Sequence, residues 1–210
     1  MKSAVILISG RGSNFRSILE ADLDLEIRCV ISNRPDAQGI EIAKTRNIKY
    51  RIIDHKLYPS RELFDAALAK TIDQFTPDYV ILAGFLRIFT SSFVLHYNQR
   101  MINIHPSLLP AFTGLNTHAR ALAAGVKVHG CTVHFVTPDL DVGPIIIQAA
   151  VPVFPDDTEE TLAQRVLHEE HKIYPKAISW LINDKIVMQG ERVLIKDTLP
   201  NAKNLISPWN

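Results

Sequence analysis

The sequence is short of cysteine and has no excess charge of either sign. Its 210 residues include two cysteines, Cys29 and Cys131, both in apolar stretches. Two cysteines are too few for a disulfide framework, so we expect buried free thiols in a reducing compartment. The 23 Lys and Arg residues nearly balance the 22 Asp and Glu residues, which gives a net charge of +1. This balance excludes a global electrostatic attraction to nucleic acid or an anionic membrane, but it is compatible with a local basic pocket.

Long apolar runs are also missing. The five apolar residues at 4–8 are fewer than the core of a signal peptide contains. No run approaches the roughly 18 residues that a membrane-spanning helix requires. We therefore predict a cytoplasmic protein without a membrane or nucleic-acid partner. A hydrophobic content of 47% excludes a disordered chain, and no repeat or linker interrupts it, so we predict one domain over 1–210 with a surface tail at 197–210.

Strand-like and helix-like segments alternate through the first half of the sequence. The strand-like segments are continuously apolar, as expected for strands buried on both faces of a sheet. This rhythm predicts an α/β fold with an open, mostly parallel, Rossmann-like sheet and helices on both faces. The predicted strands cover 4–8, 25–32, 48–54 and 79–83, and the predicted helices cover 13–21, 37–46 and a long segment that Ser60 caps and Pro77 ends.

The second half predicts a different arrangement. Two long strand-like runs are joined by a turn at 137–144, which indicates an antiparallel pair. A long helix follows, and Pro175 is expected to bend or break it. The predicted elements are a short strand at 101–105, a helix near 117–124, strands at 126–136 and 145–153, a helix at about 158–183 and a hairpin at 187–195.

A glycine loop joins the first strand to the first helix. Its sequence, Ser9-Gly10-Arg11-Gly12-Ser13-Asn14, begins like a dinucleotide fingerprint, but Phe15 stands where the third glycine is needed. The backbone N–H groups of such a loop point at a bound anion. The loop therefore favours a single phosphate, with Arg11 adding charge. The alternative is a tight turn that caps a helix.

Asn103 and His105 lie at the end of the short strand at 101–105. Residues two apart on a strand share a face, and the carboxyl ends of strands in open α/β sheets are where ligands bind. An amide donor beside an imidazole suits acyl transfer, with Asn103 holding an oxyanion and His105 moving protons. Asp141, in the turn, would orient the imidazole.

Other interpretations of these residues stay open. A histidine at a strand end is often a structural hydrogen-bonding group, and Asp141 taken alone is an ordinary turn residue. Ser107, His105 and Asp141 resemble a hydrolase triad, although no G-x-S-x-G turn presents the serine. His105, His118, His129 and His134 are close in sequence but lack metal-site spacing, so we predict no metal.

Together these segments resemble the folate-dependent formyltransferases. Residues 103–110 (NIHPSLLP) match the core motif of that family, and four further motifs lie around it in family order, at 9–14, 82–88, 133–136 and 140–144. The resemblance runs from the first strand to about Tyr174. It implies transfer of a formyl group from 10-formyltetrahydrofolate, as co-substrate, to the amine of glycinamide ribonucleotide, a step of purine synthesis.

The resemblance also implies roles for individual residues. The catalytic residues would be Asn103, His105 and Asp141, with His134 near the site. Gly12, Ser13 and Asn14 would hold the ribonucleotide phosphate, and Glu170 its ribose hydroxyls. Without the family match, we would interpret Glu170 as a solvated carboxylate on a helix and Arg61 as an exposed arginine. Leu86, Ile88 and Phe89 would then be ordinary core residues. The folate would contact Arg61, Leu86, Arg87, Ile88, Phe89, Asn103, Thr137, Pro138, Asp139, Leu140 and Asp141.

Rival functions share parts of this pattern. A formyltetrahydrofolate hydrolase has most of the motifs, but normally after a regulatory domain. Methionyl-tRNA formyltransferase has the core motif but adds an RNA-binding domain, for which we expect neither room nor charge here. A non-catalytic folate or nucleotide-binding module would not need the trio of Asn103, His105 and Asp141. Thr113 and Val142 depart from the family pattern in the loops, and the sequence leaves monomer and homodimer open.

Overall fold

The computed structural model describes residues 1–197, so nearly all of the predicted surface tail at 197–210 lies outside the described residues. The contacts divide the chain into two compact units. The first unit comprises Met1–Asn103 and Phe135–Leu140. The second comprises Ile104–His134 and the chain from Asp141 onward. The prediction of a single domain stays a prediction.

The strands follow the order β3-β2-β1-β4-β5-β6-β7. Pairing is parallel from β3 through β5, and β6 and β7 pair antiparallel. The fold class is therefore confirmed as α/β with a mostly parallel sheet. The strand bounds are β1 Lys2–Ile8, β2 Leu25–Ser32, β3 Tyr50–Ile52, β4 Tyr79–Leu82, β5 Met101–His105, β6 Val128–Phe135 and β7 Ile145–Pro152.

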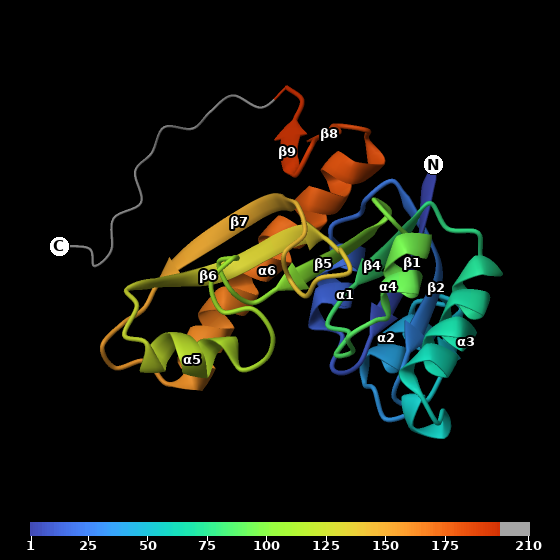
Figure 1. The fold of residues 1–210 in the computed structure, drawn as a ribbon, viewed down its shortest axis with the longest axis horizontal. Helices are drawn as coiled ribbons and strands as arrows, with labels where there is room; N and C mark the ends of the chain where they lie inside the picture. Colours follow the sequence, from blue (N-terminus) through green and yellow to red (C-terminus); the bar gives the residue numbers. More distant parts are fainter. Residues whose placement is uncertain (198–210) are drawn as a thin grey trace. The chain divides into compact units, whose positions relative to one another are not determined.

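Helices cover both faces of the sheet in the first unit. Alternate residues of β1 point to opposite faces, and Val5 and Leu7 join a buried cluster with aromatic and aliphatic residues of α3 and α4. These two helices lie next to each other (Figure 1). On the other face, Ile8 meets α2, where a Cβ added at Gly39 would lie 2.6 Å from the Ile8 side chain. The helices are α1 Ser13–Glu20, α2 Gly39–Thr45, α3 Arg61–Asp73 and α4 Ser91–His96.

The second unit packs a long helix on the antiparallel pair. Helix α6, Glu159–Ile182, runs along β7 (Figure 1). Helix α5, Thr117–Ala123, also contacts α6. The predicted hairpin is present as β8, Ile186–Gln189, and β9, Arg192–Ile195. Residue Thr158 caps α6 by accepting the N–H of Thr161 at 3.3 Å.

Several sequence predictions need correction. Pro175 does not break α6, which is continuous through it because buried residues from Leu162 to Leu181 hold both halves in one packed face. A bend at Pro175 stays a prediction. The third strand is shorter than predicted, Tyr50–Ile52, and a single 3₁₀ turn at His55–Leu57 follows it. Helix α4 was missed because six residues are too few to show a helical period.

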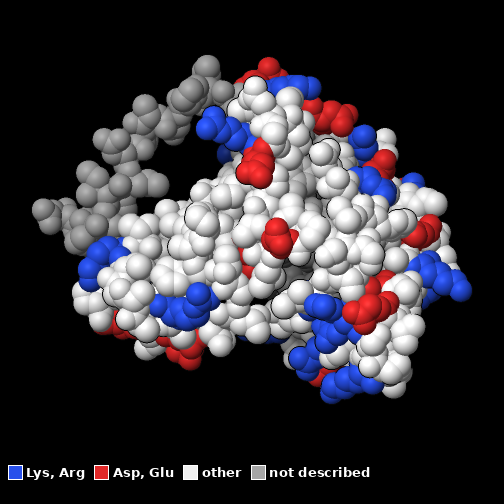
Figure 2. Space-filling view, in the orientation of Figure 1, with Lys and Arg blue, Asp and Glu red and all other residues white. Residues whose placement is uncertain are grey.

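Charged side chains of both signs are mixed on the face shown in Figure 2, in keeping with the net charge of +1. Among the helices within residues 1–197, none is long and apolar enough to cross a membrane.

An ion pair fixes the chain where it enters α6. Asp157, with 3% of its side chain exposed, accepts two hydrogen bonds of 2.8 Å from the Arg165 guanidinium and one of 2.7 Å from the Phe154 N–H. The Arg165 guanidinium holds the pKa of the Asp157 carboxyl well below its ordinary value. The charged form of Asp157 therefore stabilises the folded state.

The variant Asp157→Asn is expected to lower the free energy of unfolding by about 2 kcal/mol at neutral pH, because charge-assisted hydrogen bonds are lost. The folded-state pKa is depressed, so the stabilisation is present above an unfolded pKa of about 4 and is lost as pH falls below it. Urea unfolding at pH 7 and at successively lower pH measures both effects. Asp156→Asn removes an exposed neighbouring charge and is the control; an equal loss in that variant would contradict the prediction.

Candidate active site

His105 and Asp141 meet in the second unit. The strand β5 ends at His105, and Asp141 lies in the loop before β7 with a positive φ of 56°. His105 Nδ1 lies 3.4 Å from Asp141 Oδ2, and the two side chains are 6% and 9% exposed. On the other oxygen of the carboxylate, His134 Nε2 of β6 lies 3.8 Å away. The structure therefore brings together three residues that the sequence analysis singled out.

Main-chain groups complete the surroundings of this pair. His105 Nε2 lies 3.0 Å from the carbonyl oxygen of Phe112, and Asp141 Oδ2 accepts the N–H of Gly114 at 2.8 Å. Both partners of the imidazole are acceptors. A protonated ring can donate to the carboxylate and the carbonyl together, whereas a neutral ring can donate to one of them. Each ring nitrogen of His105 thus faces an oxygen acceptor.

Two further histidines lie near His105, and burial lowers the pKa of both. The rings of His118 and His129 are 5.3 Å apart, edge to face. Burial lowers the pKa of His129 to about 4, and the nearby His118 and His105 add to the effect. Burial also lowers the pKa of His118. His105 differs from them in having a carboxylate in contact with its ring.

The alternative of a Ser-His-Asp triad is wrong. The Ser107 side chain is fully buried, and its hydroxyl donates to the carbonyl oxygen of Ala111 at 2.6 Å. The ring nitrogen of His105 that a nucleophile would need faces Phe112 instead. Over residues 1–197, no group of three or more His, Cys, Asp or Glu side chains is placed to hold a metal ion.

Both cysteines are buried free thiols, as predicted. Burial raises the pKa of the Cys29 thiol to about 11, and burial followed by the charge of Glu170 raises that of Cys131. Neither is poised to act as a thiolate nucleophile.

Glu170 is not a solvated helix carboxylate. It lies on α6 in the second unit and is 7% exposed. A carboxylate buried to this extent requires a specific reason to be there. The interpretation of Glu170 as a solvated carboxylate, made without the family resemblance, is therefore wrong.

The glycine loop lies in the first unit, and its geometry requires glycine. Gly12 is the N-cap of α1 with a φ of 75°, and an added Cβ would lie 2.7 Å from the Cα of Gly39. No side chain within the described chain caps α1, and its first turn, which includes Ser13 and Asn14, has no acidic residue. The first amide groups of α1 therefore form an electropositive end suited to an anion.

Asn103 also belongs to the first unit. It lies on β5, two positions before His105, and pairs in register with Leu82 of β4. Its side chain is half-buried, at the carboxyl end of the parallel strands.

The segment Leu86–Phe89, in the first unit, is not uniformly core. Leu86 is 65% exposed and Ile88 is 56% exposed, so the interpretation of these two residues as core is wrong. Phe89 is buried and stacks between Phe85 and Phe93, with centroid distances of 5.4 and 4.4 Å. The segment therefore presents two apolar side chains on a buried aromatic base.

The remaining predicted folate contacts are also in the first unit. Arg61 is exposed at the first turn of α3, and the Arg87 guanidinium lies 5.4 Å from the Phe64 ring. Thr137–Leu140 form a turn in which the Thr137 hydroxyl donates to the carbonyl oxygen of Asp139 at 3.2 Å. Leu140 is 47% exposed.

Sequence reasoning missed the main-chain partners of the site. The carbonyl of Phe112 and the N–H of Gly114 come from a loop whose path depends on positive φ angles at both residues. The glycine at position 114 was the one feature of the sequence that indicated an unusual backbone conformation in this loop. Reasoning also missed the contacts of Ser9 with Asn33 and Leu86, at 2.6 and 2.8 Å.

Comparison with known proteins gives one family. A family model described as formyl transferase matches residues 1–178. Phosphoribosylglycinamide formyltransferase of Escherichia coli K12 is 46% identical over 188 residues, 88% of this chain and 89% of that protein. The bovine trifunctional purine biosynthetic protein adenosine-3 is 47% identical over 190 residues, 89% of this chain and 19% of that protein.

Solved structures agree with these relatives. Glycinamide ribonucleotide transformylase 1 from Symbiobacterium toebii matches with a TM-score of 0.90 and 47% identity, over 94% of this chain and 95% of that one. A formyltetrahydrofolate deformylase from Pseudomonas syringae has the same fold with a TM-score of 0.86, but it is 28% identical and this chain covers 67% of it. The Escherichia coli and Symbiobacterium toebii transferases are thus more similar to this chain in sequence and in length than the deformylase is.

Proposed function

The chain belongs to the formyl transferase family, and we propose that Asn103, His105 and Asp141 form its catalytic centre. The enzyme formylates glycinamide ribonucleotide in purine biosynthesis, the activity for which its relatives at 46% and 47% identity are named. We take the formyl donor to be 10-formyltetrahydrofolate and the place of the reaction to be the cytoplasm. The observation that carries the catalytic assignment is the contact of His105 with Asp141 at 3.4 Å.

The reaction is a direct transfer through a tetrahedral intermediate. The neutral amine of glycinamide ribonucleotide attacks the formyl carbon, and the carbonyl electron pair moves onto oxygen. When the intermediate collapses, the bond between that carbon and N10 of the folate breaks. The amine loses a proton and N10 gains one, which yields formylglycinamide ribonucleotide and tetrahydrofolate.

Each proposed catalytic residue has one task. The Asn103 amide and the protonated His105 ring donate to the oxyanion, whose charge exists only in the intermediate and its transition states. Because Nδ1 of His105 faces Asp141, the carboxylate supports the imidazolium form and fixes the plane of the ring. Nε2 would then exchange its carbonyl partner, Phe112, for the oxyanion when substrate binds.

The two substrates use different parts of the chain. Gly12, Ser13 and Asn14 hold the ribonucleotide phosphate at the amino end of α1, where no acidic first-turn residue opposes an anion. Glu170 binds the ribose hydroxyls. The exposed Leu86 and Ile88 contact the apolar surface of the folate, Phe89 supports them from the core, and Arg61 and Arg87 supply positive charge. The 137–141 turn closes on the pterin.

Acceptor dependence separates this function from its rivals. Purified protein is mixed with 10-formyltetrahydrofolate, with and without glycinamide ribonucleotide, and deformylated folate is followed spectroscopically. Release is expected only with the nucleotide, with one formylated nucleotide for each tetrahydrofolate. An equal rate without nucleotide would make the enzyme a hydrolase. Binding of both ligands without release would make it a binding module.

A further inference from the structure

Ser9 belongs to two functional parts of the first unit. It is the first residue of the glycine loop, and its side chain is 1% exposed. Its N–H donates to the carbonyl oxygen of Gly84 at 3.0 Å, and its Oγ accepts the N–H of Leu86 at 2.8 Å. These two bonds hold the main chain on both sides of Phe85, where the proposed folate segment begins.

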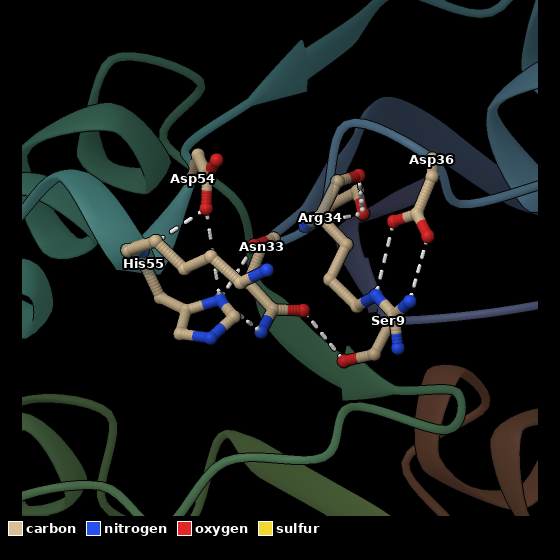
Figure 3. A network of polar contacts seen from close by, with 8 residues as sticks. Ser9, Asn33, Arg34, Asp36, Asp54 and His55 are labelled. Carbon is tan, nitrogen blue, oxygen red and sulfur yellow. Dashed lines mark hydrogen bonds and ion pairs between the residues drawn. The ribbon is translucent and has the colours of Figure 1, made fainter.

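The hydroxyl of Ser9 is itself oriented by a polar network (Figure 3). Because its oxygen accepts from Leu86, its hydrogen is available to donate, and it does so to Asn33 Oδ1 at 2.6 Å. His55 Nδ1 lies 2.8 Å from the main-chain carbonyl oxygen of Asn33 and 3.2 Å from its NH2 group. Asn33 is 2% exposed, and its own carbonyl accepts the N–H of His55 at 3.3 Å. The hydrogen bond to the buried Asn33 therefore fixes the position of the Ser9 oxygen.

The segment that Ser9 holds is anchored in the core by Phe85 and Phe89, but its main chain has no regular secondary structure. Residues 83–90 form neither helix nor strand, and Leu86 and Ile88 are mostly exposed. At the far end, the buried carboxylate of Asp65 accepts the N–H of Thr90 at 2.6 Å. The segment thus lies between two backbone anchors, and of these Ser9 is the one that also begins the glycine loop.

We propose that the Ser9 hydroxyl is a positioning group. It fixes the Leu86–Phe89 main chain relative to the glycine loop, in the position that binds formylfolate. The proposal rests on the proposed function, because it assumes that this segment holds formylfolate. Ser9→Ala removes the acceptor for Leu86 and the donor to Asn33, but keeps the backbone bond to Gly84. The segment then adopts several conformations, which weakens formylfolate binding and leaves the chemical step intact.

Two measurements on Ser9→Ala test this role. The KM for formylfolate is expected to rise about 5- to 20-fold, while kcat at saturation and the KM for the ribonucleotide stay within about threefold. In hydrogen exchange, the Leu86 amide is expected to exchange at least about tenfold faster, while the Thr90 amide, bound to Asp65, keeps its protection.

Ser3→Ala is the matched control. Ser3 lies near the start of β1 and is fully buried. Its hydroxyl donates to Asp78 Oδ2 at 2.8 Å and accepts the Asp78 N–H at 3.2 Å, so the variant also loses hydrogen bonds of a buried serine. It is expected to leave the KM for formylfolate and the Leu86 exchange rate unchanged. An unchanged KM in Ser9→Ala, or an equal rise in Ser3→Ala, would overturn the proposal. An inactive wild-type enzyme would overturn the proposed function instead, and the exchange experiment does not depend on that result.

Discussion

Replacing His105 with alanine is expected to lower kcat by about 10²- to 10⁴-fold, the range found when a positioned acid or base is removed. The imidazole is 6% exposed and is held at both nitrogens, by Asp141 at 3.4 Å and by the Phe112 carbonyl at 3.0 Å. Water entering the vacated space cannot reproduce a charged donor fixed in that orientation. The loss should therefore fall on the transition state.

Binding of the ribonucleotide distinguishes loss of catalysis from loss of folding in His105→Ala. The phosphate is assigned to Gly12–Asn14 at the start of α1, and His105 is assigned to the chemical step. The dissociation constant of glycinamide ribonucleotide, measured by calorimetry, should therefore stay within about threefold of wild type. His168→Ala, which removes an exposed imidazole from α6, is the control and should keep full activity. Turnover near the wild-type level in His105→Ala would refute the assignment.

Much of the fold could be predicted because local patterns and packing agree. The run at 4–8 is apolar on both faces and became a strand buried on both faces, and Ser60 caps α3 by accepting the N–H of Leu63 at 3.3 Å. At Pro175 the local pattern and the packing disagree. A proline inside a helix destabilises it by about 3 kcal/mol, but burial of the long apolar face of α6 stabilises the helix by more than one missing hydrogen bond costs. Such a balance cannot be read from the proline alone.

The candidate site was predictable in its side chains and not in its main chain. His105 lies at the end of a strand and Asp141 lies in a turn, positions at which sequence patterns predict ligand-binding side chains, and the two residues are in contact. The N–H of Gly114 and the carbonyl of Phe112 carry no side-chain signature. Their positions follow from a loop with φ angles of 54° at Phe112 and 77° at Gly114, which only the folded chain determines. The same holds for the backbone N–H of Leu86, which Ser9 accepts.

Asp141→Asn is expected to lower kcat by about 10²- to 10³-fold, because it removes the negative charge beside the imidazolium while keeping the shape of the side chain. In the wild-type protein the N–H of Gly114 donates to Asp141 Oδ2 at 2.8 Å. The amide oxygen of the new asparagine can accept the same hydrogen bond, so the loop should keep its conformation. What disappears is the charge that favours a protonated ring able to donate on both sides. Steady-state kinetics at saturating concentrations of both substrates measures this loss.

The comparison of Asp141→Asn with Asp141→Ala separates charge from geometry. If the carboxylate acts mainly through its charge, both variants lose kcat to a similar extent. Asp141→Ala in addition weakens formylfolate binding, because residue 141 of the proposed folate turn loses the bond from the Gly114 N–H that holds it. If it acts mainly by holding the loop, Asp141→Asn retains most of its activity. Asp156→Asn, which removes an exposed charge from the same unit, controls for net charge. A kcat of Asp141→Asn within about threefold of wild type would show that the contact with His105 does not serve the chemical step.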